Sequence, residues 1–197
     1  MLGKVPMSRN STQSRCTEGD YRWLFSSSSD ELYRLCFMLT ADDGLARASF
    51  ATAMEHTLKH GSHVFREWMW TWARRQIIKA CITALRSEIL NDARSFCPTD
   101  AADLALVAAD QRRTLSNSTA ETLQRRLLKL DVLPRFVFVL RCLEGYSGRE
   151  IALLLDVDRM TLAAAYKRAA EVIGSSEQAG FQRCAGGASE LAGVAVL

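Results

Sequence analysis

The sequence predicts an all-α protein built from two small helical domains. Apolar residues recur at helical spacing in most segments between residues 30 and 173. Only three prolines occur in 197 residues, so few helix interiors are interrupted. A hydrophobic content of 48% is ample for packed cores. Together these observations predict helix-on-helix packing and no sheet.

The first predicted domain is a three-helix bundle over residues 21–94, preceded by a disordered leader over residues 1–20. Its first helix follows the serines before Asp30, with apolar residues at i, i+3, i+4 and i+7. A break at residues 40–44 precedes a second helix over about 45–60, which Gly61 ends. The third helix is long, over about 64–93, and Trp68 and Trp72 are expected in its core.

The second predicted domain covers residues 119–174, after a linker over 95–118 that is partly helical. Pro134 suits the first turn of one of its helices. Residues 175–197 are rich in glycine, alanine and serine and are expected to form a flexible tail.

A helix-turn-helix is predicted at the end of this second domain. Ser147 and Glu150 form an S-x-x-E capping box before an apolar run, and Asp158 can cap the next helix, from Arg159 to about residue 173. Leu162 is expected to fill the wedge between the two helices. Such a pair commonly places its second helix in the DNA major groove. An ordinary helical hairpin is the alternative.

The bulk composition limits the function classes. No uncharged apolar run reaches eighteen residues and the N-terminus lacks a secretory core, so a cytoplasmic protein without a membrane span is expected. The six cysteines contain no C-x-x-C pair and are predicted to be reduced thiols. A net charge of +3 permits nucleic-acid binding.

Catalytic and metal-binding patterns are weak. No nucleophile–base set, phosphate loop or carboxylate pair stands out, so the chain is expected not to be an enzyme, and to need no cofactor and no small-molecule substrate. The three histidines, His56, His60 and His63, have a spacing that could align on a helix, but Gly61 interrupts it and no further ligand lies nearby. No metal site is therefore predicted.

Two segments resemble a known family. Residues 65–78 are similar to the F-x-x-W-L-x-x-I-A helix, and residues 133–155 to the L-P-x-x-x-R-x-V-F-x-L and E-G-x-S-x-x-E-I-A-x-L-L motifs, of bacterial sigma factors of the sigma-70 family and the extracytoplasmic-function (ECF) type. The resemblance spans about residues 30–173. It implies a protein that binds core RNA polymerase and directs promoter recognition, with an anti-sigma factor as a further partner to be sought.

The resemblance implies two DNA-binding surfaces. The N-terminal bundle would capture the −10 strand, where aromatic rings stack on bases and cations follow phosphates. The residues expected there are Trp70, Arg74, Arg75 and Lys79. The second helix of the helix-turn-helix would bind the −35 duplex, and its expected contacts are Arg159, Thr161, Ala164, Lys167 and Arg168.

The chain departs from the family in two places. The D-x-x-Q pair of the polymerase-binding helix is absent from residues 46–54, and residues 163–165 are alanines where the family has a lysine and an arginine. An alternative function is therefore a degenerate sigma-like regulator that binds DNA or a protein partner without initiating transcription. An unrelated helical enzyme is a third alternative.

Overall fold

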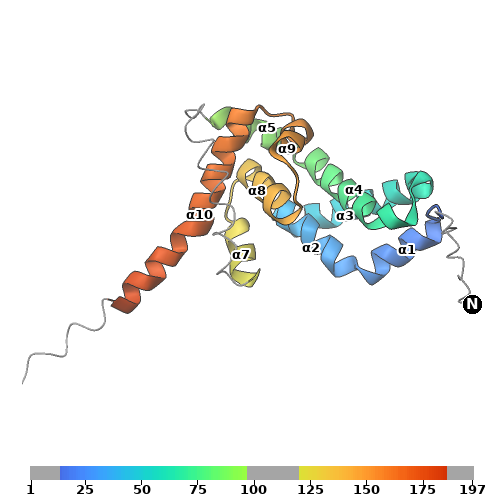
Figure 1. The fold of residues 1–197 in the computed structure, drawn as a ribbon, viewed down its shortest axis with the longest axis horizontal. Helices are drawn as coiled ribbons and strands as arrows, with labels where there is room; N and C mark the ends of the chain where they lie inside the picture. Colours follow the sequence, from blue (N-terminus) through green and yellow to red (C-terminus); the bar gives the residue numbers. More distant parts are fainter. Residues whose placement is uncertain (1–13, 97–119, 186–197) are drawn as a thin grey trace, which may run out of the picture. The chain divides into compact units, whose positions relative to one another are not determined.

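The computed structural model describes residues 14–96 and 120–185, with side chains for 14–96 and 121–174. Every regular element in these ranges is a helix, which confirms the predicted fold class (Figure 1). The chain divides into two compact units, Met1–Ala84 and Leu85–Leu197. No helix among the described residues is long and apolar enough to cross a membrane.

The first unit contains the predicted three-helix bundle with one helix added in front. Its main core is formed where α3 packs on both α4 and α2. The elements are α1 (Glu18–Ser27), α2 (Ser29–Thr40), α3 (Asp43–His60), the 3-10 turns η1 (Gly61–His63) and η2 (Arg66–Trp68), and α4 (Met69–Ala84). Fully buried residues include Leu32, Leu35, Cys36, Leu39, Ala53, Ile77, Ile78 and Cys81.

The leader predicted over residues 1–20 is too long, because residues 14–20 belong to the fold. Thr17 caps α1 in a capping box with Asp20, which the pattern of T-x-x-D permits. The Cys16 amide donates to the Val64 carbonyl at 2.8 Å, and Asp20 pairs with Arg66. These contacts tie the start of α1 to the segment before α4. Residues 1–13 lie outside the described part.

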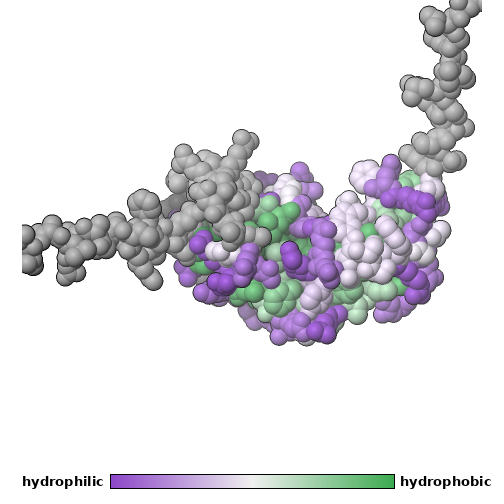
Figure 2. Space-filling model, turned by 90° about the horizontal axis from the view of Figure 1, so that it is seen from below, coloured by the Kyte–Doolittle hydropathy of each residue, from purple (hydrophilic) through white to green (hydrophobic). Residues whose placement is uncertain are grey.

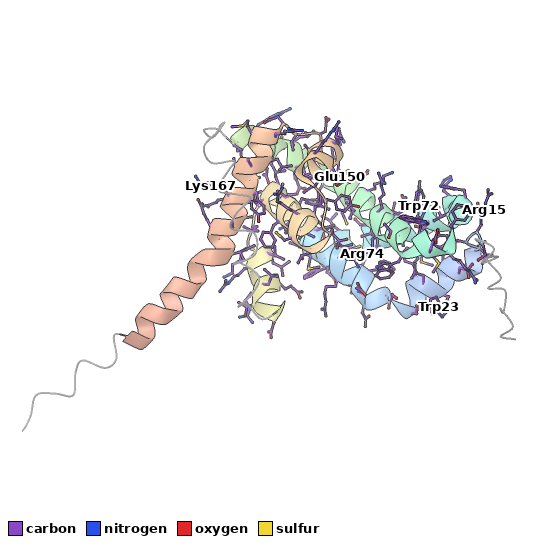
Figure 3. All side chains as sticks on the ribbon, viewed as in Figure 1. Arg15, Trp23, Trp72, Arg74, Glu150 and Lys167 are labelled. Carbon is purple, nitrogen blue, oxygen red and sulfur yellow. The ribbon has the colours of Figure 1, made fainter. Side chains whose placement is uncertain are left out.

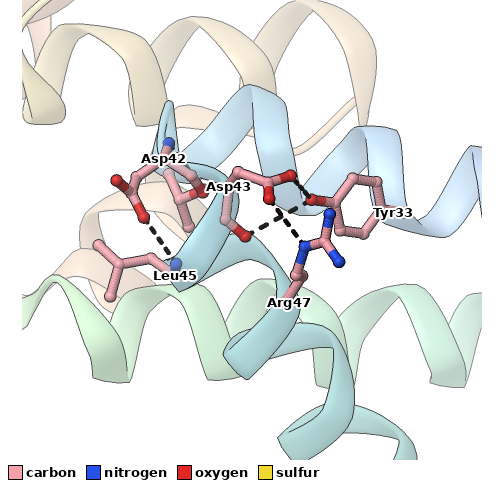
Figure 4. A network of polar contacts seen from close by, with 6 residues as sticks. Tyr33, Asp42, Asp43, Leu45 and Arg47 are labelled. Carbon is pink, nitrogen blue, oxygen red and sulfur yellow. Dashed lines mark hydrogen bonds and ion pairs between the residues drawn. The ribbon is translucent and has the colours of Figure 1, made fainter.

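The turn between α2 and α3 forms where the sequence predicts a break. Ala41 adopts a left-handed conformation with φ 55°, and Asp42 caps α3 by accepting from the Leu45 amide at 2.7 Å. The Asp43 carboxylate then accepts hydrogen bonds from the Tyr33 hydroxyl and, at 2.8 Å, from Arg47 (Figure 4). These bonds hold the pKa of Asp43 below its ordinary value, with Tyr33 the larger cause.

The long third helix predicted over 64–93 is not one helix. Leu85, at φ −111° and ψ 15°, separates α4 from α5 (Arg86–Ser95). Helix α5 belongs to the second compact unit, where it packs on α8 (Val132–Phe138), and the Asp92 carboxylate accepts from the Leu133 amide at 3.0 Å. The two units therefore separate before Leu85, rather than after residue 94.

The second unit is a helical domain built around α8 and α10. Its further elements are α7 (Ala120–Leu127), a π-helical turn η4 (Val139–Leu143), α9 (Gly148–Leu155) and α10 (Arg159–Ala185). The backbone of α10 continues to Ala185, so the predicted tail begins as helix. Most of the predicted linker, residues 97–118, and the last part of the tail, residues 186–197, lie outside the described residues.

Hydrophobic residues also reach the surface that Figure 2 draws, between hydrophilic ones. The most exposed large hydrophobic side chains among the described residues are Trp23 at 65%, Trp68 at 56% and Leu153 at 76%. Isolated exposed apolar residues are common in soluble proteins, but exposed tryptophan is a frequent component of binding surfaces.

The Asp20 cap makes the first unit sensitive to acid. Hydrogen bonds from the Thr17 amide, from Arg66 and from the Thr17 hydroxyl lower the pKa of Asp20 from 3.8 to about 2. The stabilisation is therefore complete above pH 3.8 and is lost as the pH falls through 3.8 toward 2. We expect carboxyl NMR titration to find this low pKa and Arg66→Gln to raise it.

Lys59→Gln, which removes an exposed cation elsewhere in the same unit, should leave the titration of Asp20 unchanged. An Asp20 pKa that is the same with and without the Arg66 guanidinium would contradict this account.

Candidate nucleic-acid interface

The first helix of the predicted helix-turn-helix begins at its capping box. The Ser147 hydroxyl accepts from the Glu150 amide at 3.3 Å, and the Glu150 carboxylate accepts from the Ser147 amide at 2.8 Å. Both bonds span three residues, so the S-x-x-E pattern is sufficient to predict them. Helix α9 therefore starts at Gly148, as expected.

The turn between the two helices depends on two aspartates. Asp156 ends α9 in the left-handed conformation, at φ 59° and ψ 46°, which aspartate tolerates better than most residues. Asp158 then accepts from the amides of Met160 and Thr161, both at 2.9 Å, and from the Thr161 hydroxyl. These bonds hold the pKa of Asp158 below its ordinary value, with Thr161 the main cause. The predicted cap of the second helix is confirmed.

Close packing holds the second helix, α10, in place. A Cβ added at Gly148 would lie 3.2 Å from Arg141 Nη1 and 3.9 Å from Leu162 Cδ2, so glycine lets α9 approach its neighbours. Leu162 is buried, as predicted. The Tyr166 ring stacks on Phe138 at 6.4 Å between centroids and has the Arg141 guanidinium 5.2 Å from its centre.

Tyr166 is a structural residue that the sequence analysis did not single out. Its hydroxyl also lies 3.7 Å from the Cys142 sulfur, so the ring links α10 to the end of α8 and to η4. Its spacing could have predicted this role. Tyr166 follows Leu162 by four residues and precedes Ile173 by seven, so the three side chains share one face of the helix.

The five expected −35 contacts do not form one stripe. Arg159, Lys167 and Arg168 are exposed, and Thr161 is half-buried. Figure 3 labels Lys167 on α10. An α-helix has 3.6 residues per turn, so Arg168 lies about two turns after Thr161 and on the same face of α10. Arg159 lies about two and a half turns before Arg168, which places it on the opposite face.

Ala164 is the least exposed of the five expected contacts. It is 9% exposed and lies in an unbroken buried run from Leu162 to Tyr166. Three alanines in succession let α10 pack closely against the rest of its unit. The accessible candidates are therefore Arg159, Thr161, Lys167 and Arg168.

One cation of this domain lies in the core. Arg135 in α8 is 5% exposed, and its Nη1 donates to the Leu130 carbonyl at 3.0 Å. Burial lowers its pKa, while the carboxylates of Asp92, Glu88 and Asp131 act in the opposite direction. Arg135 therefore does not add to the surface charge that DNA would meet.

The four expected −10 contacts lie on α4 as two pairs. The Arg74 guanidinium lies 5.3 Å from the centre of the Trp70 ring and donates to Glu31 at 2.7 Å (Figure 3). Arg75 and Lys79, one turn apart, are exposed. Trp70 and Arg74 are both half-buried. Arg75 and Lys79 follow Trp70 by five and nine residues, so they lie on a different side of α4 from the indole.

The prediction that Trp68 and Trp72 are core residues is wrong for Trp68. Trp68 lies in η2, before α4 begins, and is 56% exposed, with its Nε1 donating to Glu67 at 2.9 Å. Trp72 is half-buried, and His63 meets its ring edge-on at 5.2 Å. The four-residue spacing suggested one helix face, but the 3-10 turn changes the direction of Trp68.

The other histidines do not extend this contact. His56 and His60 lie 4.5 Å apart between ring centroids, one turn apart on α3. His63 has turned toward Trp72 instead. Within residues 14–96 and 121–174, no group of three His, Cys, Asp or Glu side chains is placed to hold a metal ion.

The helix that would meet polymerase lacks acidic side chains over residues 44–54. Ala46 and Ser49 are buried against the rest of the unit, and Arg47 pairs with Asp43. The other exposed residues of this stretch are uncharged: Gly44, Leu45, Ala48, Ala51 and Thr52.

Loss of the Asp158 cap should destabilise the second unit. Asp158→Ala leaves two amides of the first turn of α10 without partners, and we expect the free energy of unfolding to fall by about 1 kcal/mol. Chemical denaturation of the full chain measures this. Asp158→Asn, which keeps an accepting oxygen, should recover most of the loss. Equal losses in both variants would show that the cap contributes little.

The comparisons with known proteins agree with this local geometry. Residues 120–173 match the family model Sigma-70, region 4. No curated protein and no solved structure matches the chain. The match begins at α7 and ends within α10, so it covers the helices described above from Ala120 onward. The C-terminal part of the chain thus carries a helix-turn-helix domain of the sigma-70 region 4 kind, which supports a role in DNA binding and transcription regulation.

Proposed function

We propose that the protein is a sigma factor of the ECF type, which binds core RNA polymerase and directs it to promoters. The observation that carries the proposal is the capped helix-turn-helix within the segment that matches sigma-70 region 4. The helical unit before it resembles, in its residues 65–78, the −10-recognition helix of the same family. In this proposal the −10-binding unit precedes the −35-binding unit along the chain, in the order that the resemblance implies.

In this proposal α10 lies against the −35 duplex. Arg159 at its first turn and Arg168, two and a half turns later on the opposite face, would contact phosphates, and Lys167 adds a third exposed cation. Thr161 would lie nearest to the bases. With few exposed cations, the domain should bind DNA weakly by itself and depend on polymerase for its promoter affinity.

The first unit would hold the unpaired −10 strand along α4. Trp70, with Arg74 against its ring, offers a supported indole face, and Arg75 and Lys79 supply accessible cations. The exposed Trp68 adds a second aromatic ring that the sequence analysis had assigned to the core. Aromatic rings on which bases can stack, and cations that can neutralise phosphates, are the two components of such a site.

A second candidate is a degenerate sigma-like regulator that no longer initiates transcription. The observations that favour it are the missing D-x-x-Q pair in α3 and the buried run of alanines in α10. Such a protein would keep the helical framework and use its surfaces for a duplex or a protein partner. It would not need an anti-sigma factor.

Size-exclusion chromatography with core polymerase, followed by selection from a promoter library, tests the two candidates. Co-elution and enrichment of paired −35 and −10 elements are expected for the sigma factor. A chain that stays separate from polymerase over the micromolar range would exclude that function and favour the degenerate regulator.

Arg168→Ala should weaken binding to duplex DNA by the same factor for all sequences. A phosphate contact carries no base information, and its loss should reduce the slope of log K against log salt by about 1. Fluorescence anisotropy on promoter and scrambled duplexes at several salt concentrations measures both effects.

Arg125→Ala is the matched control, because Arg125 is an exposed arginine of α7 in the same unit, paired with Glu121. It should leave the salt slope unchanged. A change of preference at a single base pair in Arg168→Ala would instead make Arg168 a base contact.

A further inference from the structure

A groove of about 440 Å³ lies between α3 and α4 of the first unit. Its apolar lining is made of small side chains: Ala48, Ala53, Ala80 and Ala84. In a packed bundle, larger side chains would fill this space, whereas alanines leave it open. The volume lies within the usual range for sites that hold small molecules.

Two buried polar side chains line this groove without hydrogen-bond partners. Gln76 and Ser49 are each 3% exposed, and neither Gln76 Nε2 nor Ser49 Oγ has a partner in the structure. Buried polar groups almost always have partners, so each unpartnered one calls for an explanation. Both atoms can donate a hydrogen bond, and together they point to a ligand that accepts.

The hydroxyls of Thr52 and Thr83 in the groove are already engaged. Thr52 donates to the Ala48 carbonyl and Thr83 to the Lys79 carbonyl, both at 2.9 Å. Thr52 and Thr83 are exposed and form the outer part of the groove, whereas Gln76 and Ser49 are the polar residues of its buried part. Gln76 Nε2 and Ser49 Oγ are therefore the buried unpartnered donors among the residues that line the groove.

The charge of the lining has one sign. Lys79 and His56 line the groove, and none of its lining residues is acidic. The nearby Glu55 is held by Lys59 at 2.6 Å. The pKa of His56 is lowered by burial first, and by His60, Lys79 and Lys59, so Lys79 is the cation of the groove at neutral pH.

We propose that this groove binds a small carboxylate that carries an apolar chain. The carboxylate would accept from Gln76, Ser49 and Lys79, and the chain would lie along the alanines. An uncharged alcohol could satisfy one donor but would leave the lysine without a counter-charge. A cation is excluded by the sign of the lining.

Calorimetric titration of the full chain with octanoate, and with 1-octanol as the uncharged analogue, tests the site. We expect octanoate to bind and 1-octanol to bind at least tenfold more weakly. Gln76→Leu removes the donor at nearly constant volume, and Lys79→Gln removes the charge. Each should weaken octanoate binding by about tenfold.

Two further variants keep the test decisive. Ala48→Phe fills the groove from its rim, where Ala48 is exposed, and should abolish binding while the fold is retained by circular dichroism. Lys59→Gln removes a cation of α3 that does not line the groove and should leave binding unchanged. Binding of octanoate that survives both Gln76→Leu and Ala48→Phe would overturn the proposal.

Equal affinity for octanoate and 1-octanol would overturn the assignment of a carboxylate. No binding of octanoate by the natural chain would overturn the site itself. None of these results depends on whether the protein binds polymerase or promoter DNA, because the probes and the readout involve neither.

Discussion

Helix α10 packs on α8 through the ring of Tyr166, which stacks on Phe138 and lies beneath the guanidinium of Arg141. This contact sets the rotation of α10 about its axis, and the rotation decides which of its residues DNA can reach. Residues 162–166 are all buried, so the accessible cations lie at the first turn and beyond the buried run. The exposed arginines of α10, Arg159 and Arg168, are therefore separated by about two and a half turns.

The same domain gains a helix that the sequence analysis placed elsewhere. Helix α5 continues from α4 after a single residue, Leu85, but its contacts are with α8. Asp92 accepts from the Leu133 amide near the start of α8, and the buried Arg135 lies among the carboxylates of this contact. A buried guanidinium needs such partners, since desolvation is costly.

The groove in the first unit exists because small residues line α3 and α4. Alanines between α3 and α4 leave a groove, and Gln76 and Ser49 place unpartnered polar atoms within it. An apolar residue at either position would remove the unpartnered group. The bundle instead keeps a concave, positively charged surface beside Lys79, which is distinct in its chemistry from the tryptophans at the start of α4.

The sequence by itself determined the all-α class, the ends of α3 and α9, and the caps of α9 and α10. These features depend on interactions within about four residues, such as Ser147 with Glu150 and Asp158 with Thr161. Only the tertiary structure decided that Trp68 is exposed, that Ala164 is buried and that α5 packs on α8. Burial depends on neighbours that are distant in the sequence, and helical spacing identifies a face without identifying what covers it. For that reason the position of the helix-turn-helix was predictable from the residues, whereas the burial of Ala164 within it was not.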